Sequence, residues 1–240
     1  TDSLAQRDTG WIQYYVESAQ EALDSVLQAF RVAEQALLPA MVNLDAFYVS
    51  HALEPVAVPA QELVDAWLPP FDPPQRLDPQ RPSSWGNVVS ADMFCRHRQA
   101  IEEAMARVPA LAAEADQDWA RHTGRSWGVV ERYRCDDAPT AIVTMGSMCG
   151  TAREAVDALR DAGHAVGLVK LRLFRPLPAA ALRAALHGVR DAVVLDRNHS
   201  PGLGGVLHQE LRAALYGTAG APRVHGLLAG VGGVSVPPQR

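Results

Sequence analysis

The sequence of 240 residues has little cysteine and no excess of basic charge. Its cysteines, Cys95, Cys135 and Cys149, form no C-x-x-C pair, so the chain cannot build a zinc or iron–sulfur site from its own thiols. Free buried thiols in a reducing cytoplasm are what this pattern predicts. A formal net charge of -5 argues against nucleic-acid binding. No apolar run approaches the ~20 residues that span a bilayer, so we expect no membrane segment.

Proline is concentrated in one stretch, and this stretch divides the chain. Residues 68–82 carry six of the 17 prolines, which predicts an extended linker after a short helical turn at residues 61–67. The linker either crosses a partner's surface or only covers the chain as a loop, and linkers more often do the second. A helix follows at residues 90–122, broken or kinked at Pro109 and ended by Gly124. We therefore expect three segments: residues 1–68, the linker and long helix of residues 69–135, and residues 136–240.

The first segment predicts one helix and one strand. The apolar members of residues 18–35 lie three and four positions apart and define a buried face: Leu23, Val26, Leu27, Phe30 and Ala33. Asp24 and Gln28 fall on the other side, where we expect water. Pro39 separates this helix from residues 41–44, which suit a strand buried on both faces.

A compact domain rarely begins with a polar loop, here closed by Gly10, that leads into one helix and one buried strand. A lone strand needs neighbours for its backbone donors and acceptors. We therefore expect either further chain before Thr1 or a partner that covers this edge.

From Asp136 onward, strands alternate with helices. The expected strands are residues 141–146, 165–173, 191–195 and 224–228, and the expected helices are residues 151–162, 178–186 and 204–216. This alternation predicts a parallel sheet with helices on its faces and right-handed crossovers. Residues 231–240 form a tail rich in glycine and proline without a periodic signal.

Two glycine-rich loops each lead from a strand into a helix, a position that can bind phosphate. They are residues 146–151 and 201–205. Neither has the G-x-G-x-x-G spacing, and the second strand ends in Leu171-Arg172-Leu173-Phe174, without the acidic residue that holds an adenine ribose. A dinucleotide site is therefore not expected, and tight-turn geometry explains the loops without a ligand.

Several short motifs, taken in their order and spacing, resemble the alpha subunit of the pyruvate:ferredoxin oxidoreductase family. In the first segment they are Gln6-Arg7-Asp8-Thr9-Gly10-Trp11, Gln20-Glu21-Ala22-Leu23-Asp24, Met41-Val42-Asn43-Leu44-Asp45-Ala46-Phe47 and Ser50-His51. In the last segment they are Gly146-Ser147, Gly150-Thr151-Ala152, Leu171-Arg172-Leu173-Phe174-Arg175-Pro176-Leu177-Pro178 and Leu195-Asp196-Arg197-Asn198-His199-Ser200-Pro201-Gly202. The resemblance implies an α/β fold. Part of a thiamine-diphosphate pyrimidine-binding domain would be joined, by the linker and long helix, to a transketolase C-terminal-like, doubly wound parallel-sheet domain.

The resemblance also implies a reaction, the coenzyme-A-dependent oxidative decarboxylation of pyruvate or a related 2-oxo acid. Thiamine diphosphate would be shared with a beta subunit. Mg²⁺ and [4Fe-4S] clusters would lie in partner subunits, which pass electrons to ferredoxin or flavodoxin. The glutamate that activates the cofactor lies upstream of the matching region in the family, so we assign no catalytic residue and expect this chain alone to be inactive. One alternative is an assembly module on the same fold. The other is a nicotinamide-dependent oxidoreductase, although the spacing of the glycines argues against it.

For substrate binding, the resemblance points to Arg7 and Thr9. A guanidinium can hold a planar 2-oxo acid carboxylate through two parallel hydrogen bonds. The alternative is a surface ion pair between Arg7 and Asp8. We assign neither Glu17 nor Glu21 to catalysis, because a carboxylate in the first turn of a helix is explained by the helix dipole.

Three further polar residues follow strands, where α/β sheets place ligands. Asp45 and His51 flank the end of the first predicted strand, and Ala46 stands where the family commonly has glycine. Arg197 precedes the second glycine-rich loop. Whether these three act at the site or only at loop and subunit contacts is left open by the sequence, with structural roles favoured.

Overall fold

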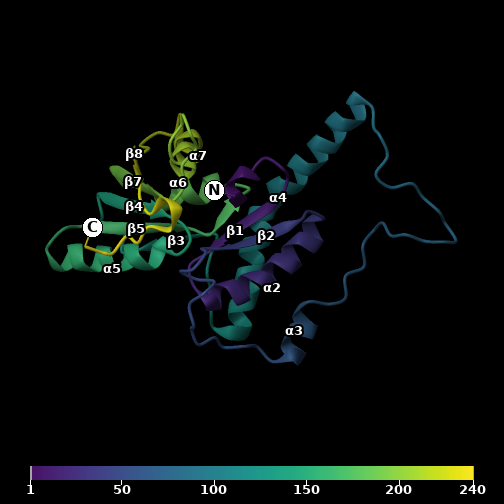
Figure 1. Ribbon diagram of the computed structural model, residues 1–240, viewed down its shortest axis with the longest axis horizontal. Coiled ribbons are helices and arrows are strands. Elements are labelled where there is room, and N and C mark those ends of the chain that lie inside the picture. The colour runs from purple at the N-terminus through teal and green to yellow at the C-terminus, as the bar shows by residue number, and fades with distance from the viewer. Residues whose placement is uncertain (1, 240) are drawn as a thin grey trace.

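Two β-sheets organise the chain, which the computed structural model describes over residues 2–239 (Figure 1). The first sheet has the strand order β2-β1-β6 and the second the order β3-β5-β4-β7-β8. The α/β class with parallel pairing, expected from the alternation of elements, is confirmed. Among residues 2–239, no helix combines the length and the apolar composition needed to cross a bilayer.

The first sheet is built around a strand that the sequence pattern did not predict. β1 (Ile12–Val16) follows the short helix α1 (Asp2–Ala5) and pairs in parallel with β2 (Ala40–Leu44). The sequence pattern leaves residues 12–16 without an element, because a strand of five residues is too short to show a clear period. The prediction that β2 is buried on both faces is wrong, since Leu44 is 42% exposed. β2 is the edge strand of its sheet, with β1 as its one neighbour among the described residues.

The helix between these strands, α2 (Ala19–Ala36), turns a different face inward from the one predicted. The hydroxyl of Ser18 caps its start by accepting the N–H of Glu21. Asp24 and Gln28, expected in water, are fully buried, whereas Phe30 is 57% exposed. The inward face of α2 packs against buried or half-buried arginines as well as apolar side chains. Asp24 pairs with Arg125, and the side-chain oxygen of Gln28 accepts a hydrogen bond from Arg172.

The linker and the first part of the helix that follows it form an arm that projects from the body (Figure 1), while the rest of that helix packs in the core. After α3 (Gln61–Trp67), the chain contains no helix or strand until α4 (Ala91–Thr123). Ser90 caps the start of α4 and Gly124, at φ 72°, ends it. The expected break at Pro109 does not occur, because the turns on both sides of it are held by buried residues, among them Val108 and Ala112.

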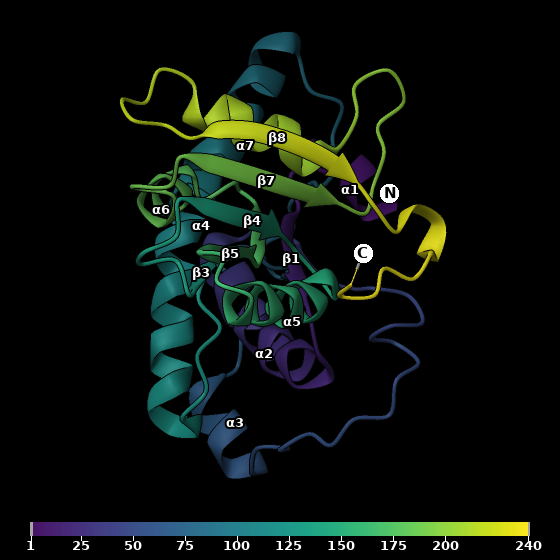
Figure 2. The same ribbon diagram turned by 90° about the vertical axis from the view of Figure 1, so that its left-hand side faces the viewer.

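The second sheet carries helices on both faces (Figure 2). Its elements are β3 (Val130–Tyr133), β4 (Thr140–Thr144), α5 (Met148–Asp161), β5 (Val166–Leu171), α6 (Ala179–Ala185), β7 (Asp191–Asp196), α7 (Val206–Leu215) and β8 (Arg223–Leu228), before a 3-10 turn at Val231–Gly233. Leu168 of β5 packs with α5, while the next residue, Val169, packs in the cluster that holds α6 and α7. β3 was not predicted as a strand and pairs antiparallel to β5 at the edge.

One strand crosses from the second sheet to the first. The single strand expected over residues 165–173 is in fact β5 followed by β6 (Leu173–Arg175), which pairs antiparallel with β1. The two sheets therefore share a continuous stretch of backbone.

Two cations at this crossing are buried and face the first segment. The Nζ of Lys170 lies 2.8 Å from a carboxylate oxygen of Glu21. Arg172 donates to the side-chain oxygen of Gln28 at 2.9 Å and lies 3.4 Å from Asp116 of α4. All of these side chains are at most 2% exposed. Buried charges of this kind are tolerated only when they are paired and hydrogen-bonded.

Asp116 is the carboxylate on which this cluster depends. It also accepts the N–H groups of Trp127 at 3.0 Å and Gly128 at 2.9 Å and the hydroxyl of Ser126 at 2.6 Å. Burial raises the pKa of Asp116, but Arg172 and these donors lower it further, so that the pKa lies below its ordinary value.

We predict that Asp116→Ala lowers the free energy of unfolding by about 3–5 kcal/mol, because Arg172 is left buried without its carboxylate. Urea unfolding followed by circular dichroism measures the change. Asp78→Ala is the control, since Asp78 pairs with Arg81 on the exposed linker and water screens such a pair, so that its loss should change stability little. Equal effects of the two substitutions would contradict the proposed importance of the cluster.

The lowered pKa of Asp116 also sets the sign of a pH effect. A carboxyl that is more acidic in the folded protein stabilises it fully above the unfolded value of 3.8 and ceases to do so as the pH falls through the folded value. The difference in unfolding free energy between the wild type and Asp116→Asn should therefore stay constant from about pH 7 to about pH 5 and shrink as the pH falls below 3.8. Urea titrations at several pH values test this, and a constant difference would refute it.

Candidate functional site

The loop that carries Arg7 is a tight turn between α1 and β1. The N–H of Arg7 donates to the carbonyl of Leu4, and the N–H of Thr9 to that of Gln6 at 3.1 Å. Gly10 closes the turn at φ 92°, a conformation that residues with a Cβ rarely adopt. The sequence therefore fixes the exit of this loop into β1.

A groove of about 530 Å³ opens beside this loop, and we call it the arginine groove. Three arginines from three separate elements line it: Arg7 of the loop, Arg98 of α4 and Arg175 of β6. Its remaining lining is Asp8, Gly10, Ile101, Glu102, Met105, Ala106, Pro109, Pro176 and Leu177. Three cations against two carboxylates make the groove suited to a small anion with an apolar part.

The guanidinium of Arg7 is held in place by contacts that leave some of its N–H donors available. One of its Nη atoms donates to the carbonyl of Leu4 at 3.1 Å, and its Nε lies 3.7 Å from Glu210 of α7 and 4.0 Å from Asp8. The ion pair with Asp8, which the sequence offered as an alternative, is thus at the limit of such a contact. A guanidinium carries five N–H donors, so Arg7 keeps the capacity to bind a carboxylate.

Thr9 lies on the same loop but outside the lining of the groove. Its hydroxyl donates to the carbonyl of Gln6 at 2.6 Å on the exposed side of the turn. In this arrangement Thr9 shapes the loop, and a contact with substrate would require the hydroxyl to turn.

The first glycine-rich loop already has an anion beside it, supplied by this chain. Asp45 accepts the N–H of Ser147 at 2.7 Å, at the start of α5. Arg197 donates to the hydroxyl of Ser147 at 2.7 Å and lies 3.7 Å from Asp45. Asp45 and Arg197 are therefore brought together. His51 lies apart from them: it is exposed, and the centroid of its ring is 4.7 Å from that of Phe47.

The second glycine-rich loop is filled in the same way. Asp196 accepts the N–H groups of Leu207 and His208, both at 3.0 Å, and the amide of Asn198 at 2.9 Å. Burial raises the pKa of Asp196, although these donors work in the opposite direction. A Cβ placed on Gly205 would lie 2.0 Å from Asp196, so glycine is needed for the loop to close on this carboxylate.

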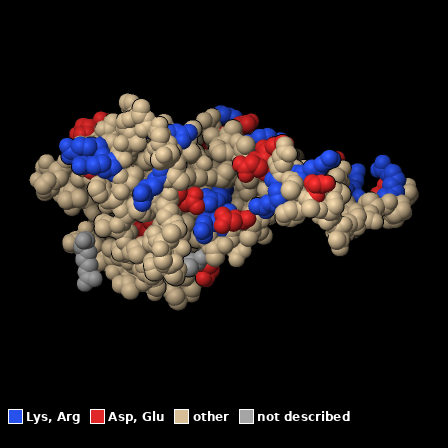
Figure 3. Space-filling view, turned by 90° about the horizontal axis from the view of Figure 1, so that it is seen from above, with Lys and Arg blue, Asp and Glu red and all other residues tan. Residues whose placement is uncertain are grey.

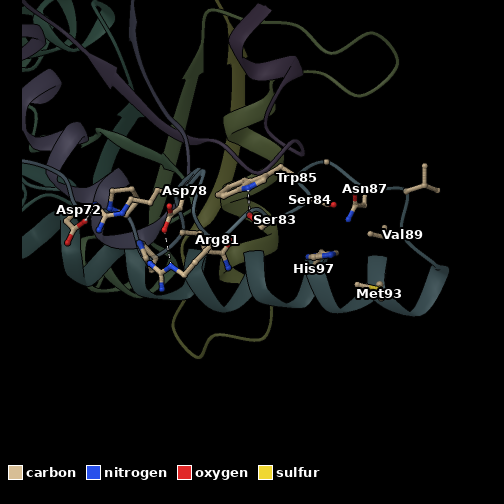
Figure 4. Close-up of a pocket in the computed structure, with 16 residues that line it drawn as sticks. Asp72, Asp78, Arg81, Ser83, Ser84, Trp85, Asn87, Val89, Met93 and His97 are labelled. Atoms are coloured by element: carbon tan, nitrogen blue, oxygen red, sulfur yellow. Dashed lines mark hydrogen bonds and ion pairs between the residues drawn. The ribbon is translucent and has the colours of Figure 1, made fainter.

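A wider hollow of about 1170 Å³ lies elsewhere, between the linker and the start of α4 (Figure 4). Asp78, Arg81, Trp85 and His97 line it, and all but Asp78 are exposed. On the face drawn in Figure 3, basic and acidic side chains are interspersed rather than gathered by sign. Within residues 2–239, no three His, Cys, Asp or Glu side chains come together as a metal site.

Sequence reasoning missed Arg98, Arg175 and Glu210, which surround Arg7. Nothing local links them, since they come from a helix, a strand and another helix. The buried cations Lys170 and Arg172 did leave a signal: two charges at alternate positions of a strand that is otherwise apolar require buried partners.

Comparison with known proteins shows which fold and which family the chain resembles. A solved 2-oxoglutarate:ferredoxin oxidoreductase from Magnetococcus marinus, with 2-oxoglutarate, coenzyme A and succinyl-CoA bound, has the same fold at a TM-score of 0.58 and 17% identity; the match covers 95% of this chain and 40% of that one. Two family descriptions match. They are "Pyruvate flavodoxin/ferredoxin oxidoreductase, thiamine diP-bdg" over residues 1–117 and "Pyruvate:ferredoxin oxidoreductase core domain II" over residues 138–240.

Relatives of known name are more similar in sequence. The pyruvate synthase subunit PorA of Methanothermobacter thermautotrophicus is 45% identical over 239 residues, which are 99% of this chain and 61% of that protein. The ketoisovalerate oxidoreductase subunit VorA of Pyrococcus abyssi is 39% identical over 97% of this chain and 60% of its own length. The chain belongs to the pyruvate:ferredoxin oxidoreductase family. It spans about three fifths of the length of these relatives.

The side chains described here do not by themselves fit thiamine diphosphate. The two helix starts that could meet a diphosphate hold Asp45 and Asp196 instead. Glu17 and Glu21 are both engaged with Lys170. What this chain offers to a ligand is the arginine groove.

We predict that Gly205→Ala lowers the free energy of unfolding by at least about 2 kcal/mol, because a methyl group would collide with Asp196. Gly150→Ala is the matched control, since α5 leaves its position open and alanine is the better helix former by about 0.5–1 kcal/mol. Thermal and urea unfolding of both variants compare them. A neutral Gly205→Ala would show that Asp196 does not need this close approach.

Proposed function

We propose that this chain is the alpha-type subunit of a 2-oxoacid:ferredoxin oxidoreductase and that its arginine groove binds the carboxylate of the 2-oxo acid. The observation that carries the proposal is the position of Arg7 at a groove with two further arginines and an apolar wall. The reaction is the oxidative decarboxylation of pyruvate or a related 2-oxo acid to an acyl-coenzyme A. The names of the relatives, a pyruvate synthase subunit and a ketoisovalerate oxidoreductase subunit, support this class of substrate.

In this proposal, Arg7 binds and orients the substrate. Its planar guanidinium holds the carboxylate through two hydrogen bonds, which fixes the direction of the neighbouring keto carbon. Arg98 adds positive charge on the opposite wall, and Ile101 and Met105 cover the apolar end of a small side chain. Thr9, on the same loop, contacts the substrate once its hydroxyl turns away from the carbonyl of Gln6.

The remaining chemistry belongs to groups that other subunits hold. A beta subunit would hold the diphosphate of thiamine diphosphate and its Mg²⁺, and the cofactor would supply the electron sink that decarboxylation of a 2-oxo acid needs. Three separate cysteines cannot ligate a [4Fe-4S] cluster, so iron–sulfur subunits carry the electrons to ferredoxin or flavodoxin. This chain alone is therefore inactive, and a beta subunit completes the cofactor site.

We predict that Arg7→Ala, in the assembled complex, raises the KM for pyruvate about 10- to 100-fold, as expected for the loss of hydrogen bonds to a charged group. The KM of Arg7→Lys should lie between those of the wild type and Arg7→Ala, because a lysine keeps the charge but not the paired donors. Steady-state kinetics with pyruvate and with 2-oxoisovalerate measure both effects.

The control is Arg76→Ala, which removes an exposed linker arginine paired with Asp72. It should leave the KM unchanged. An Arg7→Ala complex with the wild-type KM for every 2-oxo acid tested would overturn the substrate role of the groove and favour an assembly module.

A further inference from the structure

Arg175 is the arginine of the groove that is most tied to its surroundings. Its Nε donates to the backbone carbonyl of Arg7 at 3.2 Å, and its Nη2 donates to Glu210 at 2.6 Å. The side chain is 17% exposed, compared with 28% for Arg7. Arg175 thus joins the substrate-binding loop to α7.

The backbone of Arg175 is also held in place, because it belongs to a paired strand. β6 pairs with β1, and Arg175 lies opposite Gln13 in that pairing. Gln13 in turn donates through its side chain to the carbonyl of Ser3 at 2.9 Å. The loop between Ser3 and Gln13 is therefore held by β6 and β1 together, while the backbone N–H groups of Arg7 and Thr9 bond only to carbonyls within the loop's own turn.

Glu210 is shared between two arginines. The same carboxylate oxygen lies 2.6 Å from Arg175 and 3.7 Å from the Nε of Arg7. A carboxylate this close to Arg7 competes with any carboxylate that arrives from solvent. The short contact with Arg175 keeps Glu210 in place and limits this competition, because a charge-assisted pair at 2.6 Å is much the stronger of the two.

We propose that Arg175 is a positioning residue for substrate binding, which aims Arg7 through its backbone carbonyl and holds Glu210 away from the guanidinium of Arg7. This inference rests on the proposed function of the groove. Arg175 acts through Arg7, so its loss weakens the binding of the 2-oxo acid and leaves the chemical steps unaffected.

The test uses the complete complex with its partner subunits and measures kcat and the KM for the 2-oxo acid and for coenzyme A. Arg175→Ala should raise the KM for the 2-oxo acid about tenfold, the loss expected for hydrogen bonds to charged groups. The value of kcat should stay within about twofold, and the KM for coenzyme A should not change. Arg175→Lys retains the charge and one donor nitrogen, and should give a smaller increase in the KM for the 2-oxo acid.

Two double variants separate positioning from general damage. In an Arg7→Ala background, Arg175→Ala should produce no further rise in KM, because both substitutions act on one contact. In an Arg175→Ala background, Glu210→Gln should lower the KM again, because the competing charge is gone. Arg183→Ala is the matched control: it removes an exposed arginine that donates to the carbonyl of Ala214, remote from the lining of the groove.

The outcomes distinguish the two proposals. If Arg7→Ala leaves the KM unchanged, the proposed function itself fails. If Arg7→Ala raises the KM and neither Arg175→Ala nor Arg175→Lys does so, only the positioning role fails. A fall in kcat with an unchanged KM, or additive effects of Arg7→Ala and Arg175→Ala, also overturns it.

Discussion

The pairing of two buried cations with buried carboxylates is the interaction on which the rest of this molecule depends. Lys170, near the end of β5, and Arg172, between β5 and β6, point toward α2 and α4, where Glu21 and Asp116 meet them. Removing such charges from water costs several kcal/mol each, and only complete pairing offsets this cost. The geometry of α2 and α4 relative to the second sheet is therefore tied to the exact positions of a few polar atoms, and the groove lies within that frame.

The alternation of strands and helices in residues 136–240 could be predicted from the sequence, because the elements there follow clear apolar periods and turn residues. Prediction from the sequence failed where polar atoms were buried. The period of α2 named Phe30 as buried and Gln28 as exposed, and both are reversed, since no hydrophobic pattern can record that a cation such as Arg172 will lie against the helix. It also failed for β1 and β6, which are too short to show a period and exist because they pair with each other.

The candidate site was predictable only in part. Arg7 could be picked out by resemblance because it stands in a short contiguous motif. Arg98, Arg175 and Glu210 could not, because their meeting depends on the crossing of β6 and on the path of α4 past the loop. Likewise, the two glycine-rich loops suggested anion sites, and no local pattern indicated that Asp45 and Asp196 would occupy them. Sites assembled from distant segments are set by tertiary structure, and local spacing is silent about them.

The exchange of β6 between the sheets has a practical meaning for anyone who wishes to dissect the chain. The linker looks like a natural place to cut, but a fragment that ends there would carry β1 without one of its two neighbours. The complementary fragment would present β6 with open hydrogen-bonding groups, an edge prone to self-association. Co-expression of the two halves, rather than separate purification, is the route that this topology favours.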